Sequence, residues 1–131
     1  MVVIGKHLCG AATDIVLRYG ARAFGIALCC HAKSDGSLYC NPEYLANLTQ
    51  KVSLRRLHRL TCYQHCFGNS TKLTEKQRSL KTLGFKIRQM LDVGRLLYLR
   101  GRGYVCGLVH YCGQSLTGEQ WLLWARASGS D

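Results

Sequence analysis

The stretch that decides the fold is the opening of the chain, MVVIGKHLCGAATD (residues 1–14). Residues 1–4 form a continuous apolar run, which is typical of a strand buried on both faces of a parallel sheet. Lys6 and His7 then begin a polar turn, and a helix is expected over residues 15–19. Ligands of open α/β sheets bind beyond the carboxyl ends of the strands. Lys6 and His7 are therefore candidates for chemistry, although solvated loop residues would give the same pattern.

The residues after this turn predict a complete β-α-β unit. Thr13 and Asp14 can cap the helix by accepting hydrogen bonds from its first free amides. Gly20 is expected to end the helix. Residues 24–30 are small and apolar throughout and predict a second buried strand. A strand, a helix and a second strand with short joints should form a right-handed crossover.

The middle of the chain is harder to divide into elements. Residues 31–42 are rich in turn formers and predict a loop at the carboxyl edge of the sheet. Pro42, the only proline, can occupy the first turn of a helix that continues through Leu48. Residues 51–68 are basic and amphipathic, and the sequence does not bound their secondary structure.

A long helix is predicted over residues 74–99. Thr74 and Gln77 fit a capping box, in which each side chain satisfies the other residue's backbone amide. Apolar residues follow at helical spacing, which favours core packing. We expect the inner face to carry Leu80, Leu83, Ile87, Met90 and Leu91, and the outer face to carry Arg78, Lys81, Arg88 and Gln89.

Two strands are predicted after this helix, over residues 104–112 and 120–127, joined by a glycine-bounded turn into an antiparallel hairpin that closes the sheet. The expected fold class is therefore α/β: a β-α-β unit, a long helix and a closing hairpin. One domain is expected over residues 1–127, followed by a polar tail at 128–131.

The chain is strongly basic. Its 131 residues include 18 Lys and Arg against 7 Asp and Glu, a net charge of +11. Such a field favours association with polyanions, so nucleic acid is the leading class of partner and an acidic membrane surface the second. The sequence lacks the run of about 18 apolar residues that a bilayer-spanning helix needs, and its opening apolar run is too short for a signal peptide. An intracellular protein, cytoplasmic or nuclear, is expected.

Eight cysteines are present, without the regular spacing of a secreted disulfide scaffold. We expect reduced thiols, several of them acting as small buried hydrophobes. Two local groups of soft ligands could hold zinc: Cys29, His31 and Cys40, or His58, Cys62, His65 and Cys66. Neither group has the paired spacing that makes a zinc prediction strong, so no metal site is assigned from the sequence.

Three segments carry a family likeness: KHLCGAATD (6–14), ALCCH (27–31) and GRLLYLRGRGY (94–104). In this order they resemble the carboxyl-terminal part of the Trm13 family of tRNA 2′-O-methyltransferases. The resemblance implies a Rossmann-like methyltransferase sheet, S-adenosylmethionine as methyl donor, and methylation of a ribose 2′-hydroxyl in the tRNA acceptor stem. In this family a second histidine usually follows Cys-Cys-His, whereas Ala32 follows here.

Measured against that family, the chain looks like the back half of a catalytic domain. The glycine-rich turn and the ribose-binding acidic residue of the donor site have no counterpart, and neither do the family's amino-terminal zinc modules. We therefore expect weak or absent methyl transfer by the isolated chain. A missing amino-terminal half, or another chain, would supply the remainder.

The resemblance also suggests roles for individual residues. Lys6 is the first candidate for the general base or for stabilising the developing alkoxide, and His7 is the alternative base. The acceptor pocket is expected to be lined by Cys9, Gly10, Asp14, Cys29, Cys30 and His31. RNA phosphates are expected to meet Arg55, Arg56 and Arg59 (with Lys51 nearby) or Arg95, Arg100 and Arg102. Two other functions stay open: a non-catalytic basic RNA-binding remnant, and a small zinc-binding interaction module.

Overall fold

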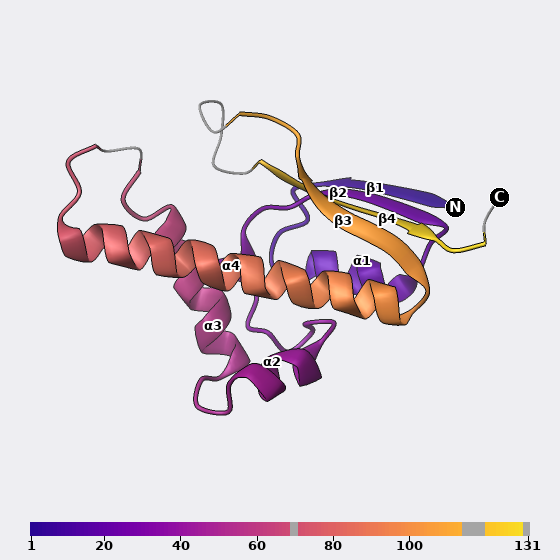
Figure 1. Cartoon of the computed structure of the whole chain (residues 1–131), viewed down its shortest axis with the longest axis horizontal. Coiled ribbons are helices and arrows are strands. Elements are labelled where there is room, and N and C mark those ends of the chain that lie inside the picture. Colours follow the sequence, from indigo (N-terminus) through magenta and orange to yellow (C-terminus); the bar gives the residue numbers. More distant parts are fainter. Residues whose placement is uncertain (69–70, 114–119, 130–131) are drawn as a thin grey trace.

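A computed structural model describes residues 1–68, 71–113 and 120–129, and shows one four-stranded sheet with helices on one side (Figure 1). The strand order is β1-β2-β4-β3. β1 and β2 are parallel, whereas β4 is antiparallel to both β2 and β3. The strands are β1 (Val2–Lys6), β2 (Ala23–Ala27), β3 (Tyr104–His110) and β4 (Trp121–Ala127). The mixed α/β fold and the closing hairpin are confirmed; the predicted turn of the hairpin and the end of the tail lie outside the described residues.

The expected β-α-β unit is present, with α1 (Ala12–Tyr19) between the two parallel strands. Gly20 follows the helix with a φ of 82°. The predicted cap is wrong: the N-cap is Ala11, and no side chain caps the helix. Thr13 and Asp14 instead lie inside the first turn, and both are buried. The helix begins earlier than expected, so these two side chains face the interior.

The prediction that the first strand is buried on both faces is also wrong. Val2 and Ile4 are 61% and 86% exposed, whereas Val3 on the opposite face packs against the core. Figure 1 shows the reason: α1 and the long helix α4 (Glu75–Gly101) cover the same face of the sheet. The other face is uncovered among the described residues.

Two short helices and two 3₁₀ turns fill the middle of the chain. The expected helix at Pro42 is confirmed as α2 (Pro42–Leu48), and the Asn41 side chain accepts a hydrogen bond from the Tyr44 amide at 3.3 Å. The basic stretch that the sequence left undivided forms α3 (Leu54–Leu60) and η2 (Thr61–Gln64). The other 3₁₀ turn, η1 (His31–Lys33), follows β2 closely.

The capping box at the start of α4 is confirmed, because Thr74 and Gln77 exchange hydrogen bonds of 2.9 and 3.2 Å between side chain and backbone. The assignment of its faces needs correction. Arg88, expected outside, is 2% exposed, and Leu83, expected inside, is 42% exposed. Gly84 explains this rotation, since a Cβ there would lie 2.8 Å from the backbone nitrogen of Gln64 in η2. The face with Gly84 and Arg88 is therefore the packed one.

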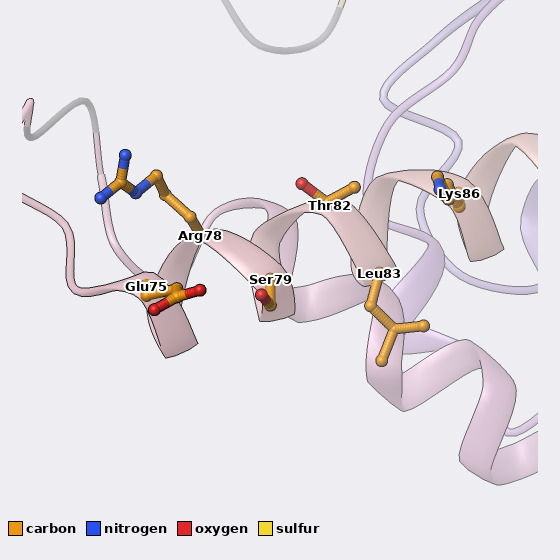
Figure 2. Close-up of a pocket in the computed structure, with 6 residues that line it drawn as sticks. All are labelled: Glu75, Arg78, Ser79, Thr82, Leu83 and Lys86. Carbon is orange, nitrogen blue, oxygen red and sulfur yellow. The ribbon is translucent and has the colours of Figure 1, made fainter.

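Leu83 instead borders a shallow depression on the first half of α4 (Figure 2). All six lining side chains come from this one helix: Glu75, Arg78, Ser79, Thr82, Leu83 and Lys86. A depression on a single helix surface brings no distant segments together. It therefore offers no candidate site.

The core is divided into two clusters that both use α4. One lies between the sheet, α1 and the end of α4, and includes Leu17, Phe24 and Leu99. The other joins α2 and α3 to the middle of α4, and includes Tyr39 and Leu91. None of the helices in the described ranges has both the length and the apolar character needed to cross a bilayer.

Candidate functional site

The turns that follow β1 and β2 lie side by side, as expected for parallel neighbours. The Gly10 amide donates to the Cys30 carbonyl at 3.1 Å. Gly10 has a φ of 62°, and a Cβ there would lie 3.0 Å from the Lys33 backbone. Only glycine suits this backbone conformation and this close approach. Gly10 therefore fixes the first turn against the second.

Three cysteines meet where these turns touch, and we call Cys9, Cys29 and Cys30 the thiol cluster. Their sulfur atoms all lie within 4.8 Å of one another, and the Cys9 and Cys29 sulfurs are 3.3 Å apart. The hydrogen bond from Cys29 lowers the pKa of Cys9, whereas burial raises the pKa of Cys29 to about 12. Cys9 is therefore the thiol of this pair that ionises first.

The structure gathers neither of the two zinc ligand sets considered from the sequence. Among the described residues, the thiol cluster is the only group of three or more metal-ligating side chains whose donor atoms lie this close together. Within the first set, His31 is engaged with Asp92, and burial raises the pKa of Cys40. All eight cysteines are free thiols.

Beneath the thiol cluster lies a buried group of charges, Asp14, His31, Asp92 and Arg95, which we call the charge network. The Arg95 guanidinium donates twice to the Asp14 carboxylate, from Nη2 at 2.7 Å and from Nε at 3.1 Å. Its Nη1 donates to Asp92 Oδ1 at 2.9 Å. Each of these three residues is at most 2% exposed. Such a pair of buried carboxylates requires the guanidinium, because an unpaired buried charge is very costly.

His31 joins the network to the second turn. Its Nδ1 lies 2.6 Å from the Cys29 carbonyl oxygen, which can only accept, so Nδ1 carries a proton. Its Nε2 lies 2.7 Å from Asp92 Oδ1 and 3.0 Å from Arg95 Nη1. With Nε2 also protonated, the four side chains would together carry no net charge. His31 thus fixes the backbone that presents Cys29 and Cys30.

Both carboxylates of the network are held ionised. Burial opposes the ionisation of Asp14, but the Arg95 charge and the Cys40 amide outweigh it, so the pKa of Asp14 is lowered. Burial likewise opposes ionisation of Asp92, and His31 with Arg95 more than compensates, so its pKa is lowered too. Arg95 therefore forms ion pairs with both carboxylates at neutral pH.

A cavity of about 350 Å³ opens beside the thiol cluster. The expected pocket residues Cys29, Cys30 and His31 line it, whereas Cys9, Gly10 and Asp14 are not among its lining residues. Asp14 is 0% exposed, so the prediction that it lines a substrate pocket is wrong. The remaining lining residues are Ala32, Lys33, Thr61, Cys62, Gln64, His65, Cys66 and Arg88.

Lys6 and His7 lie at the end of β1 and are exposed. Lys6 pairs in register with Ala27 of β2. Because side chains alternate along a strand, Lys6 shares the uncovered face of the sheet with Val2 and Ile4. His7 has a φ of 59°, which is unusual for a residue with a Cβ, and such backbone outliers cluster at functional sites. Neither side chain lines the cavity beside the thiol cluster.

The expected RNA-binding arginines lie in three different places. Arg55, Arg56 and Arg59 line a depression of about 720 Å³ that shares Cys62 with the cavity. Arg95 belongs to the charge network and is 2% exposed, so its prediction as an RNA contact is wrong.

Arg100 and Arg102 are exposed, but they lie near the opposite end of the parallel strands. A Cβ on Gly20, which precedes β2, would lie 3.8 Å from Arg102 Nη2. The nearby Tyr104 hydroxyl donates to the Ala21 carbonyl at 2.6 Å. Only the group on α3 therefore adjoins the carboxyl ends of β1 and β2.

The three segments singled out from the sequence converge in the charge network. Residues 6–14 supply Asp14, residues 27–31 supply His31, and residues 94–104 supply Arg95. In the comparison with known proteins, residues 1–126 match the family described as Methyltransferase TRM13. This chain belongs to the TRM13 family.

Several curated TRM13 proteins are similar to the chain, and each is named "tRNA:m(4)X modification enzyme TRM13". The Kluyveromyces lactis protein is 29% identical, with the match covering 95% of this chain and 35% of the relative. The Schizosaccharomyces pombe protein is 30% identical, covering 87% and 36% respectively. The chain therefore spans about a third of the length of these relatives. No solved structure matches it.

The sequence reasoning missed that the three TRM13-like segments contribute the buried residues Asp14, His31 and Arg95. One signal was available: Arg95 lies four residues from both Leu91 and Leu99, which are fully buried, so it shares their helical face. Asp92 lies three residues before Arg95 and pairs with it. A charge in the middle of an apolar stripe predicts a buried partner, and Asp14 is that partner.

Proposed function

We propose that this chain carries the acceptor side of a tRNA methyltransferase that modifies a ribose 2′-hydroxyl in the acceptor stem with S-adenosylmethionine as donor. The observation that carries the proposal is the convergence of the three TRM13-like segments beneath the carboxyl ends of β1 and β2. Ligands of such sheets bind at that edge. A tRNA substrate also implies an intracellular protein, cytoplasmic or nuclear.

The described residues fit the acceptor better than the donor. Asp14, the carboxylate that follows the first turn, is bonded twice to Arg95 and is not available to hold the hydroxyls of a nucleoside. β1 ends at Lys6, and residues 7–10 (His-Leu-Cys-Gly) follow it rather than a run of glycines. We therefore assign the donor cradle, and the rest of a Rossmann-like sheet, to a further amino-terminal half or to another chain, and derive no step through the donor.

On the acceptor side, the chain has to hold the ribose and accept its hydroxyl proton. Alignment of two reactants can contribute about 7–11 kcal/mol to lowering a barrier. Lys6 Nζ in its neutral form, or a ring nitrogen of His7, would take the proton; a charged Lys6 would instead stabilise the developing alkoxide. Both side chains are exposed, and no hydrogen bond or ion pair occupies them within the described ranges.

The depression on α3 supplies a surface for the RNA backbone. Its three arginines are exposed, and no acidic residue lies between Glu43 and Glu75 in the sequence. Contacts with phosphate are sequence-independent and weaken as salt rises. A double-stranded stem is recognised mainly by its shape and its 2′-hydroxyls. This surface and the turn of Lys6 and His7 lie toward the same end of the sheet.

Binding of tRNA tests the assigned surface. We expect the double variant Arg56→Gln/Arg59→Gln to bind tRNA more weakly and to reduce the salt dependence by about one per lost phosphate contact. Arg100→Gln/Arg102→Gln, which removes two arginines at the opposite end, is the matched control and should bind like the unaltered chain. Equal losses in the two variants would show that only net charge matters.

Labelled S-adenosylmethionine tests the reaction. Transfer to the 2′-oxygen would give tRNA with one linkage resistant to alkaline hydrolysis, because that hydrolysis needs a free 2′-hydroxyl. We expect the chain alone to transfer weakly, and Lys6→Met to reduce the residual rate by about 10²–10⁴-fold with little change in tRNA affinity. If alkaline hydrolysis cleaved the linkage that follows the labelled nucleotide, its 2′-hydroxyl would be free, and the ribose assignment would be contradicted. Tight tRNA binding without any donor binding or transfer would favour the non-catalytic remnant instead.

A further inference from the structure

The thiol cluster has no part in the proposed reaction. Direct transfer of a methyl group to a hydroxyl needs neither a cysteine nucleophile nor a change of oxidation state. Yet Cys9 and Cys29 are 20 residues apart in the sequence, and their sulfurs lie 3.3 Å apart. Three thiols assembled from two separate turns therefore require their own explanation.

We propose that Cys9, Cys29 and Cys30 form a three-thiolate site for a thiophilic divalent cation of the zinc type. Zinc–sulfur bonds of about 2.3 Å in a tetrahedral site place the sulfurs about 3.8 Å apart. The Cys9 and Cys29 sulfurs are 3.3 Å apart, and all three sulfurs lie within 4.8 Å of one another. Small side-chain rotations would bring all three to the bonding distance.

The backbone holds the three thiols in place before any cation binds. The Gly10 amide bonds to the Cys30 carbonyl at 3.1 Å, and the Cys9 amide bonds to the His7 carbonyl at 2.9 Å. His31 Nδ1 lies 2.6 Å from the Cys29 carbonyl. Each cysteine is thus tied through a backbone hydrogen bond. A site ordered in advance loses less conformational entropy on binding.

The fourth position of such a site would face the cavity. Cys29 and Cys30 line that cavity, together with Lys33, whose charge offsets part of the negative charge of the thiolates. Three protein ligands with an open fourth position are characteristic of zinc sites that exchange a water or a small ligand, whereas structural sites close all four. Cys62, His65 and Cys66 also line the cavity, so a fourth protein ligand is the competing arrangement.

Cobalt(II) is the probe for this site, because its visible spectrum reports coordination geometry. We expect the purified whole chain, kept under a phosphine reductant, to bind one cobalt ion with the strong visible absorption of tetrahedral coordination and a thiolate-to-cobalt charge-transfer band. Stoichiometric zinc should displace it. Binding should also release protons, since the ligands must be deprotonated. A weak octahedral spectrum, or no saturable binding, would overturn the proposal.

Single variants locate the ligands. Cys9→Ser and Cys30→Ser should each weaken zinc binding by more than about 100-fold. This loss of affinity is larger than that caused by removing a residue that only hydrogen-bonds to a ligand. Cys112→Ser, which changes a thiol after β3, is the matched control and should leave affinity and spectrum unchanged. Circular dichroism of the cation-free variants establishes that they are folded.

Cys66→Ser separates the open site from a closed one. Under the proposal it changes affinity by less than about threefold, as do Cys62→Ser and His65→Gln. A fourth ligand among these three residues would make one of the losses as large as that for Cys9→Ser. Unchanged binding by Cys9→Ser would place the cation elsewhere and refute the assignment. None of these outcomes depends on tRNA or on methyl transfer, so this proposal and the proposed function fail separately.

Discussion

The charge network and the turn of Lys6 and His7 share the segment 6–14 but have opposite environments. Asp14 is 0% exposed and bonded on both oxygens, whereas Lys6 and His7 project into solvent. The buried charges are paired because an unpaired one would be too costly there. The exposed side chains of Lys6 and His7 stay available to a ligand. Changes in the network should therefore affect stability, and changes in the turn should affect binding and reaction.

Removal of Arg95 should have the largest effect. Arg95→Leu leaves the Asp14 and Asp92 carboxylates buried without their shared cation, and we expect a loss of about 3–5 kcal/mol in the free energy of unfolding. Urea denaturation measures it. Arg56→Leu, an exposed arginine on α3, is the control and should change stability by no more than about 0.5 kcal/mol. Similar losses for the two variants would mean that the network does not stabilise the fold.

A methyl group at Gly94 should have the next largest effect. A Cβ there would overlap the Tyr39 hydroxyl, which donates to the Leu91 carbonyl at 2.6 Å, and would also crowd the Tyr44 ring. Gly94→Ala should therefore destabilise the chain by about 1–3 kcal/mol through overpacking. In a Tyr39→Phe background, which lacks the clashing oxygen, the same substitution should cost less. Additive losses in the double variant would contradict this contact.

The pH dependence of the free energy of unfolding should come mainly from a buried histidine, His58. His58 is 0% exposed; its Nδ1 bonds the Leu54 carbonyl at 2.8 Å, and its Nε2 has no partner among the described residues. Burial lowers the pKa of His58, so below about pH 6.5 the unfolded chain binds a proton that the folded chain does not. The free energy of unfolding should then fall as the pH drops, by at most about 1.4 kcal/mol per pH unit.

His58→Gln removes this proton and should flatten the slope between pH 7 and 5, as measured by urea denaturation at each pH. The exposed His7→Gln is the control and should retain the slope. Below about pH 4 a further loss should follow, because the lowered pKa values of Asp14 and Asp92 mean that the unfolded chain takes up protons first. An unchanged slope in His58→Gln would assign the effect to another group.

The smallest expected effect has the opposite sign. His7 adopts a φ of 59°, a conformation that costs a residue with a Cβ about 1–2 kcal/mol. His7→Gly should therefore raise the free energy of unfolding by up to about 1 kcal/mol, since the greater freedom of unfolded glycine offsets part of the gain. His7→Val should lower it. Thermal melting distinguishes them, and a glycine variant less stable than the parent would show that the turn is unstrained.

The sequence was sufficient for those parts of the fold that depend on local patterns. The parallel strands, the capping box of Thr74 and the hairpin follow from short-range rules, and the structure confirms them. The interior charges do not follow from such rules. Periodicity assigned Arg88 to the outer face of the long helix, and Arg95 was expected to meet RNA phosphates at the surface. Their burial depends on partners far along the chain.

The candidate site, too, could be predicted from the sequence only in part. Parallel topology alone predicted that the turns after residues 4 and 30 would meet, and the Gly10 to Cys30 hydrogen bond confirms it. Topology could not predict which side chains would touch. The approach of Cys9 to Cys29 depends on the left-handed backbone of Gly10 and on the exact start of α1, one residue after Ala11. Side-chain geometry at that scale is set by tertiary packing.

β1 is an edge strand whose one partner in the described sheet is β2, and Val2 and Ile4 on its bare face are largely exposed. A strand added at this edge of the sheet would have to pair with residues 2–6. Its register would therefore be set by β1, which ends at Lys6. An added strand parallel to β1 would therefore have its carboxyl end beside Lys6 and His7. Pairing of this strand with β1 would thus complete the sheet and assemble the reaction centre in the same step.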